Sequence, residues 1–111
     1  KDLFLTPPVL IVACITMAEM DYYKDEERRK IEKLMATGSL GAALQTFLLL
    51  AEAKKLAAGW FCAPLFCQNT VKKILKLPDD FEPQAFITLG FSEELPIVPQ
   101  RKDLKELVFI R

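Results

Sequence analysis

Residues 39–57 are the feature that most constrains how this chain can fold. They predict a helix that begins at Ser39 as N-cap and stops near Gly59, with Lys54 and Lys55 suiting its C-terminal dipole. Apolar residues cover nearly the whole circumference, and such a helix must be covered on both sides. In a chain of 111 residues, a second subunit is one obvious cover. The sequence therefore predicts a homodimer through the 39–57 helix.

The remaining elements predict an α+β fold, a central sheet flanked by helices. A β-branched run at 7–16 predicts a strand buried on both faces, and the alternating run 84–91 predicts a second strand. Residues 17–36 predict a surface helix with one apolar stripe of Ile31, Leu34 and Met35. A short helix capped by Asn69 is expected to turn Val71, Ile74 and Leu75 inward. Residues 92–111 predict a proline-broken arm with one helical turn and an apolar tail, 107–110, that could add an edge strand.

Composition narrows the function classes. Fifteen basic and fifteen acidic residues give zero net charge, which removes a general electrostatic argument for nucleic acid or an anionic membrane. The most apolar segment is interrupted by Gln45 and Thr46 and falls short of the roughly 20 apolar residues of a membrane span. Three cysteines, an odd number, suggest a reducing compartment. We expect a cytoplasmic protein that binds neither nucleic acid nor a membrane.

Few residues offer chemistry of their own. Histidine is absent, which excludes histidine-based catalysis and metal binding. Cys62 and Cys67 lack the second pair of ligands that structural zinc needs, so no metal site is expected, and their simplest role is that of small buried hydrophobes. Arg101 and Lys102 follow two prolines in the arm. A stiff arm can hold a cation against a phosphate, although a solvated basic dipeptide is the simpler interpretation.

Five stretches in order resemble the C-terminal part of the nitroreductase family of FMN-dependent oxidoreductases. They are PPVLIVAC, GSLGAALQTFLLLAEA, LAAGWFCAPLF, VKKILKLPDDFEPQAFITLGF and PQRKDLKELV. Together they span nearly all 111 residues. The stretch GWFCAPLF followed by DDFEPQAFITLGF is most similar to the branch related to the flavin domain of deazaflavin-coenzyme ligases.

The resemblance implies a homodimer with FMN at the subunit interface. Hydride would pass from NAD(P)H through flavin N5 to a small aromatic or quinone-type substrate, while the protein supplies orientation and electrostatics. Cys62, Ala63, Pro64 and Leu65 match the family segment whose backbone lies against the flavin near N5 and O4. Proline has no N–H, so a donor to the reduced ring must come from Ala63 or Leu65.

Other positions receive roles from the same resemblance. Arg101 matches the arginine that meets the FMN phosphate, and Lys102 is a second candidate. The aromatic residues Trp60, Phe61 and Phe66 either wall the site or pack the core or interface. Gln45 and Thr46 stand where the family usually has a Gln-Asn pair, so Thr46 departs from the pattern.

The N-terminal family segments that bind the FMN phosphate, an Arg-Ser-x-Arg-like stretch and a Pro-Ser-x-x-Asn stretch, do not occur in this sequence. We therefore expect residues 1–111 to be a single domain that holds the C-terminal portion of a nitroreductase-like domain. Two alternatives to an FMN oxidoreductase stay open at this point. One is a module that binds or reduces a deazaflavin coenzyme, and the other is a non-catalytic dimerisation fragment.

Overall fold

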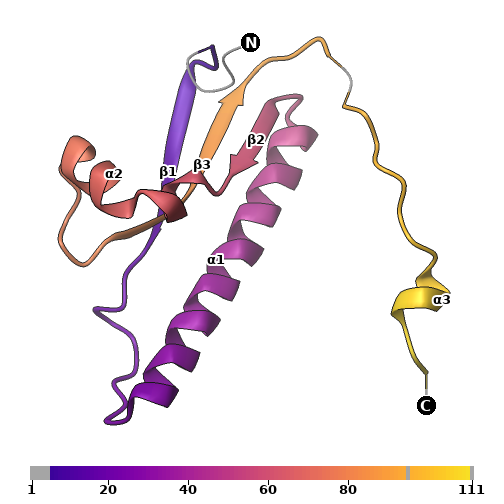
Figure 1. The fold of residues 1–111 in the computed structure, drawn as a ribbon. Coiled ribbons are helices and arrows are strands. Elements are labelled where there is room, and N and C mark those ends of the chain that lie inside the picture. The colour runs from indigo at the N-terminus through magenta and orange to yellow at the C-terminus, as the bar shows by residue number, and fades with distance from the viewer. Residues whose placement is uncertain (1–5, 95, 111) are drawn as a thin grey trace.

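The described residues form three strands, three α-helices and one 3₁₀ helix. The two helices predicted over 17–36 and 39–57 are one helix, and the strand that follows it was not predicted. The computed structural model describes residues 6–94 and 96–110. Its elements are β1 (Val9–Ile15), α1 (Glu26–Ala53), β2 (Ala57–Phe61), η1 (Ala63–Phe66), α2 (Gln68–Leu75), β3 (Glu82–Gly90) and α3 (Leu104–Leu107) (Figure 1). The predicted α+β class, a sheet with helices, is confirmed.

The sheet has the order β1-β3-β2, and both of its strand pairs are antiparallel. The longest strand, β3, lies in the centre, where its β-branched and aromatic residues are paired on both sides. β2 accompanies β3 only from Phe86 to Gly90, whereas β1 follows it from Leu89 to Glu82 with a bulge between Ala13 and Cys14. The N-terminal half of β3 therefore has a strand neighbour on one side only.

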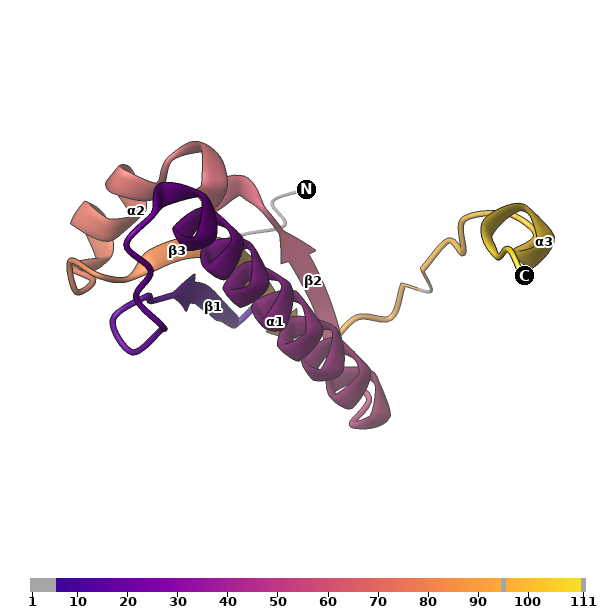
Figure 2. The same cartoon turned by 90° about the horizontal axis from the view of Figure 1, so that it is seen from below.

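The core lies between α1 and one face of this sheet. Leu40, Leu44 and Phe47 are spaced i, i+4 and i+7, so they share one side of α1. They pack against alternate residues of the strands, and the cluster comprises Ile11, Ala13, Leu40, Leu44, Phe47, Ala58, Ala85 and Ile87. Both views show α1 lying along this face of the sheet (Figures 1 and 2). Burial of a few large side chains at this contact holds the long helix in place.

The ends of α1 differ from those predicted. Its N-cap is Asp25, whose carboxylate accepts a hydrogen bond of 2.8 Å from the Arg28 N–H. The prediction of Ser39 as N-cap is wrong, because Ser39 lies inside one continuous helix of 28 residues, about 42 Å long. Packing on the sheet carries the helix through 38–41, although each glycine there costs about 1 kcal/mol relative to alanine.

Gly59 does not end this helix either. The stop comes earlier, where Lys55 adopts a left-handed conformation (φ 59°) and the N–H groups of Lys55 and Leu56 return to the carbonyls of Glu52 and Ala51. This is a Schellman-type C-cap. Gly59 lies in β2, where a Cβ would come within 2.8 Å of the Phe61 ring and 2.9 Å of the Thr88 hydroxyl. Glycine is therefore needed there for close approach rather than for a turn.

Several smaller predictions are also wrong. α2 begins at Gln68 with Cys67 in the N-cap position, so Asn69 is no cap, and of its three apolar residues only Val71 is buried, while Ile74 and Leu75 are exposed. Residues 107–110 form no strand, although the predicted helical turn is present as α3. β1 is an edge strand with Val9 and Leu10 nearly half exposed, because no further strand covers its outer side among the described residues.

The predicted stripe of Ile31, Leu34 and Met35 exists, but it faces away from the sheet. With about 100° between successive residues, Leu49 lies on the side of α1 opposite Leu40 and Leu44. These apolar residues form what we call the outer face of α1, and their exposed fractions lie between 50% and 66%: Ile31, Leu34, Met35, Leu49 and Leu50. The single chain therefore covers only one side of the helix whose circumference is apolar.

The C-terminal arm, residues 91–110, makes the molecule extended. The radius of gyration is 17.2 Å, against about 13 Å for a compact domain of this length. Both views show the arm leaving the end of β3 and holding α3 away from the sheet (Figures 1 and 2). Its apolar side chains are largely exposed, among them Phe91, Ile97, Val98, Phe109 and Ile110.

By length and composition, α1 is long and apolar enough to cross a membrane, the one such helix in the part of the chain that the structure describes. The argument from sequence counted apolar residues and the interruption by Gln45 and Thr46, whereas α1 passes a test of length and mean hydropathy. Core helices of soluble proteins pass the same test, so it decides little. The expectation of no membrane partner stays a prediction.

Candidate functional site

The segment Cys62–Leu65 follows β2 directly and forms the start of η1. Pro64 is fully buried against β3, whereas Cys62, Ala63 and Leu65 are exposed. Proline suits this place because its fixed φ favours the first turn of a helix and it has no N–H to satisfy. The buried ring anchors the turn, and the backbone on either side of it remains accessible.

Only one of the two candidate backbone donors remains available. The Leu65 N–H donates to the Cys62 carbonyl at 3.1 Å, and the Cys67 N–H donates to the Pro64 carbonyl at 3.0 Å. Ala63 is the first residue of η1, so its N–H has no acceptor within that helix. No hydrogen bond from this N–H is found within residues 6–94 and 96–110. A ligand bound at this exposed turn would therefore accept a hydrogen bond from the Ala63 N–H rather than from the Leu65 N–H.

The aromatic residues around this segment differ in their environment. Trp60 is 37% exposed on the α1 side of β2, and its indole ring lies close to Gly41 of α1. Phe66 is 92% exposed, which is unusual for so large an apolar side chain. Phe61 is half-buried on the opposite face of β2. Trp60 and Phe66 thus border the exposed backbone of Cys62–Leu65 without covering it.

A cleft of about 550 Å³ lies beside the N-terminal end of β2 and the C-terminal end of β3. Residues of both strands and the two prolines that precede β1 line it, together with the beginning of the arm: Thr6, Pro7, Pro8, Ala57, Ala58, Gly59, Phe61, Thr88, Leu89, Gly90, Phe91, Ser92, Glu93 and Glu94. Its lining is mostly apolar. It includes Phe61 but none of Cys62–Leu65, so the cleft and the predicted flavin-facing segment are separate features of this chain.

Arg101 and Lys102 are exposed in the extended part of the arm, just before α3. They line an open hollow with Gln100, Asp103 and Glu106, all from the arm itself. Asp103 caps α3 by accepting a hydrogen bond of 2.9 Å from the Lys105 N–H. Because the arm leads away from the sheet, the structure does not bring Arg101 and Lys102 together with Cys62–Leu65 (Figures 1 and 2).

Gln45 and Thr46 both lie exposed on α1. The Thr46 hydroxyl donates to the Ala42 carbonyl at 3.0 Å, one helical turn back. This side chain is thereby occupied by its own helix, which accords with its departure from the family pattern.

All three cysteines carry free thiols. Cys62 and Cys67 are exposed at the two ends of η1, so the expectation of small buried hydrophobes is wrong for both. Cys14 is half-buried in β1, and burial raises the pKa of its thiol. No group of three or more potential metal ligands gathers among the residues that the structure describes.

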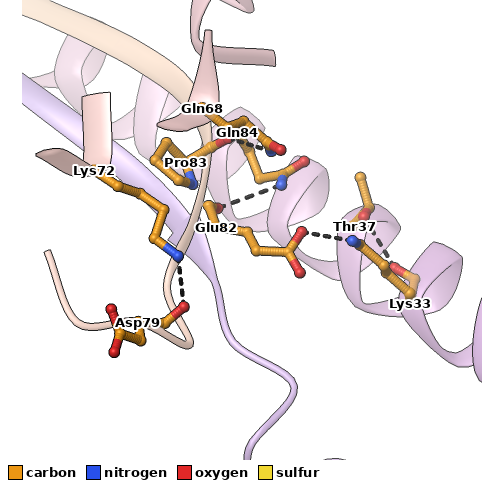
Figure 3. A network of polar contacts seen from close by, with 8 residues as sticks. All are labelled: Lys33, Thr37, Gln68, Lys72, Asp79, Glu82, Pro83 and Gln84. Atoms are coloured by element: carbon orange, nitrogen blue, oxygen red, sulfur yellow. Dashed lines mark hydrogen bonds and ion pairs between the residues drawn. The ribbon is translucent and has the colours of Figure 1, made fainter. Parts of the chain in front are cut away.

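A polar network that sequence reasoning missed ties α1, α2 and β3 together (Figure 3). Lys33 of α1 forms an ion pair of 2.5 Å with Glu82, and the Lys72 ammonium donates to the Asp79 carbonyl. The Gln68 amide donates to the Pro83 carbonyl at 2.8 Å. Most of these partners are far apart in sequence, and no local motif marks them. Only the fold could reveal them.

Residues 1–91 match the family model described as Nitroreductase family. The match includes every strand, α1, η1 and α2, and hence Cys62–Leu65, whereas Arg101 and Lys102 lie beyond it. It does not single out the branch related to deazaflavin-coenzyme ligases.

Proposed function

The chain belongs to the nitroreductase family, and from that premise we propose that it is part of an FMN-dependent oxidoreductase that reduces a small aromatic or quinone-type substrate. Membership of the family indicates flavin-dependent oxidoreductase chemistry. The family match over residues 1–91 is the observation that carries the proposal. FMN as the flavin, NAD(P)H as the electron donor and the cytoplasm as the location belong to the proposal.

Ala63 is the residue of this chain that best fits a flavin ring. Its backbone N–H has no acceptor among the described residues, and it lies on an exposed turn beside Trp60 and Phe66. An N–H group placed there can stabilise negative charge that develops on a reduced ring. A bound flavin would supply two-electron hydride-transfer chemistry, with NAD(P)H as the proposed electron donor.

Pro64 and its neighbours act by holding this donor still. The buried Pro64 ring fixes η1 on β3, and the Leu65 N–H is used within the turn. A preorganised N–H donor stabilises developing charge at little cost in free energy, because it does not have to reorient when the charge appears. Cys62 and Leu65 then contribute backbone shape and contact area rather than hydrogen bonds from side chains.

Arg101 is proposed to neutralise the FMN phosphate, with Lys102 as a second cation. A guanidinium binds phosphate oxygens in a bidentate manner, which a lysine cannot do. In the single chain the arm holds α3 away from the sheet, so joint binding by Arg101 and Ala63 requires the arm to fold back or to pack on a second copy. The apolar residues of the arm favour such packing, because they are exposed in the single chain.

The homodimer is proposed to form through the outer face of α1. Its five large apolar residues are at least half exposed and lie in two groups, residues 31–35 and 49–50, on the helix side that does not cover the sheet. If a second copy packed the same face against it around a two-fold axis, the outer faces of α1 in both copies would be covered. This arrangement extends the predicted interface of 39–57 back to residue 31.

The first experiment is flavin binding by the complete protein. Purified protein should show a flavin absorbance band at about 450 nm or bind added FMN. Native mass measurement should show whether further polypeptide accompanies this chain. A colourless protein that binds no added FMN would overturn the proposal.

A second experiment tests the phosphate contact. Arg101→Gln should weaken FMN binding by about tenfold or more, the loss of roughly 1.4 kcal/mol of charge-assisted hydrogen bonding. Lys105→Gln removes the same charge from the same arm and serves as the matched control. Equal weakening by both variants would argue against a specific role for Arg101.

A further inference from the structure

Gln68 donates a hydrogen bond to the N-terminal half of β3, which β2 does not reach. β2 pairs with β3 only as far as Phe86, so among the described residues β1 is the one strand that pairs with Glu82 to Ala85. Pro83 is fully buried in this stretch. A buried backbone carbonyl must find a donor. The Gln68 side chain supplies it, since its Nε2 donates to the Pro83 carbonyl at 2.8 Å (Figure 3).

Gln68 also stands at a particular place along the chain. It is the first residue of α2 and follows η1 with only Cys67 between them. The Cys67 N–H donates to the Pro64 carbonyl, which connects the end of η1 to its buried proline. The turn that carries Ala63 is therefore fixed to β3 at Pro64 and again just beyond its end at Gln68.

We propose that Gln68 is a positioning residue, which sets the place of the Ala63 N–H by tying the end of η1 to β3. This inference rests on the proposed function, because it assigns a role in holding a flavin at that N–H. Gln68 itself contacts no flavin. Its amide acts through the Pro83 carbonyl, and the exposed backbone of Cys62–Leu65 moves when that tie is broken.

The neighbouring glutamine provides a contrast. The Gln84 amide donates to the Glu82 carbonyl at 3.3 Å, a hydrogen bond of the same chemical kind but within β3. It connects two residues of one strand and reaches neither η1 nor α2. Loss of the Gln84 hydrogen bond should therefore perturb β3 without displacing Ala63.

The test uses Gln68→Glu in the complete protein. Glutamate at the first residue of α2 favours the helix through its dipole, so the variant is expected to fold. An ionised carboxylate cannot donate to the Pro83 carbonyl. Asn69→Glu is the matched control, because it adds the same charge one residue later on an exposed side chain that does not bond to β3. Gln68→Met and Gln84→Met form a second, uncharged pair.

Two quantities are measured, the FMN dissociation constant and the reduction potential of the flavin at saturating FMN. Gln68→Glu and Gln68→Met should weaken FMN binding and shift the two-electron potential to more negative values. A tenfold loss of differential binding corresponds to about 30 mV. Asn69→Glu and Gln84→Met should stay close to the wild type in both quantities. The potential is decisive, because a variant that merely unfolds in part loses flavin without changing the potential of what remains bound.

The outcomes separate the two proposals. If the wild type binds FMN and the Gln68 variants match their controls in potential, the positioning role is wrong and the proposed function stands. If the wild type binds no FMN, both are wrong. If Gln68→Met does not fold, Gln68→Glu against Asn69→Glu still decides.

Discussion

At the scale of single residues, the glycines show how much one missing Cβ decides. Gly59 has the Phe61 ring and the Thr88 hydroxyl within 3 Å of the position that a Cβ would occupy, whereas Gly38 has no such atom within 4 Å. One substitution, alanine for glycine, should therefore have opposite effects at these two places.

Gly59→Ala should lower the free energy of unfolding by about 1–3 kcal/mol, because β2 must shift to make room. Gly38→Ala should raise it by up to about 1 kcal/mol, because alanine restricts the unfolded chain and suits the interior of α1. Urea unfolding followed by circular dichroism measures both. A loss of similar size in the two variants would contradict this account of β2 packing.

At the scale of elements, the start of α1 links sequence, charge and pH. The Asp25 carboxylate caps the helix, accepts a hydrogen bond from the Arg28 N–H and forms an ion pair of 2.6 Å with its guanidinium. The backbone hydrogen bond from Arg28 is the main reason that the pKa of Asp25 lies below its ordinary value of 3.8. A carboxyl with a lowered pKa stabilises the fold above pH 3.8, and that stability is lost as the pH falls through the lower folded value.

Asp25→Ala should accordingly reduce helix content at pH 7, and its remaining helix content should depend less on pH than that of the wild type. Asp25→Asn keeps a good N-cap without a titrating group, so it should retain the helix and also show a weaker pH dependence. Ser39→Ala should cause no loss, because Ser39 caps nothing. Far-ultraviolet circular dichroism between pH 7 and pH 2 tests all three. Parallel acid transitions in the wild type and Asp25→Asn would refute the role of this carboxylate.

At the scale of the whole molecule, the chain leaves large apolar surfaces uncovered. The outer face of α1 and the arm both expose side chains that a lone domain would bury, and the radius of gyration exceeds that of a compact domain. Exposed apolar surface of this extent marks an interaction site. A stable dimer buries about 1,200–2,000 Å² or more in total. The outer face of α1 and the arm are the two exposed apolar surfaces from which the proposed dimer would draw its buried area.

Leu49→Glu should therefore weaken self-association by at least about tenfold, or about 1.4 kcal/mol, because it places a charge among the apolar residues of the proposed interface. Ile74→Glu introduces the same charge at an exposed apolar residue of α2 and should leave association unchanged. Sedimentation or native mass measurement over a range of concentrations compares the two. A wild type that stays monomeric at high concentration would remove the proposed dimer.

The sequence determined the class and the family of this protein. Strands β1 and β3 follow from β-branched runs, and a helix that is apolar on all sides follows from residues 39–57. The restriction of the backbone donor beside Pro64 to Ala63 or Leu65 also follows from the sequence, because proline has no N–H. These features are local, so a pattern of neighbouring residues is enough to predict them.

Only the tertiary structure decided where α1 begins and ends and which side of it is covered. Local signals at Gly38 and Ser39 favoured a break, but each is worth only about 1 kcal/mol. The burial of Leu40, Leu44 and Phe47 against three strands outweighs them. The hydrogen bond from Gln68 to Pro83 and the ion pair of Lys33 with Glu82 likewise join residues that are far apart in the sequence. No local pattern encodes such pairs, because their energy exists only once the chain has brought them together.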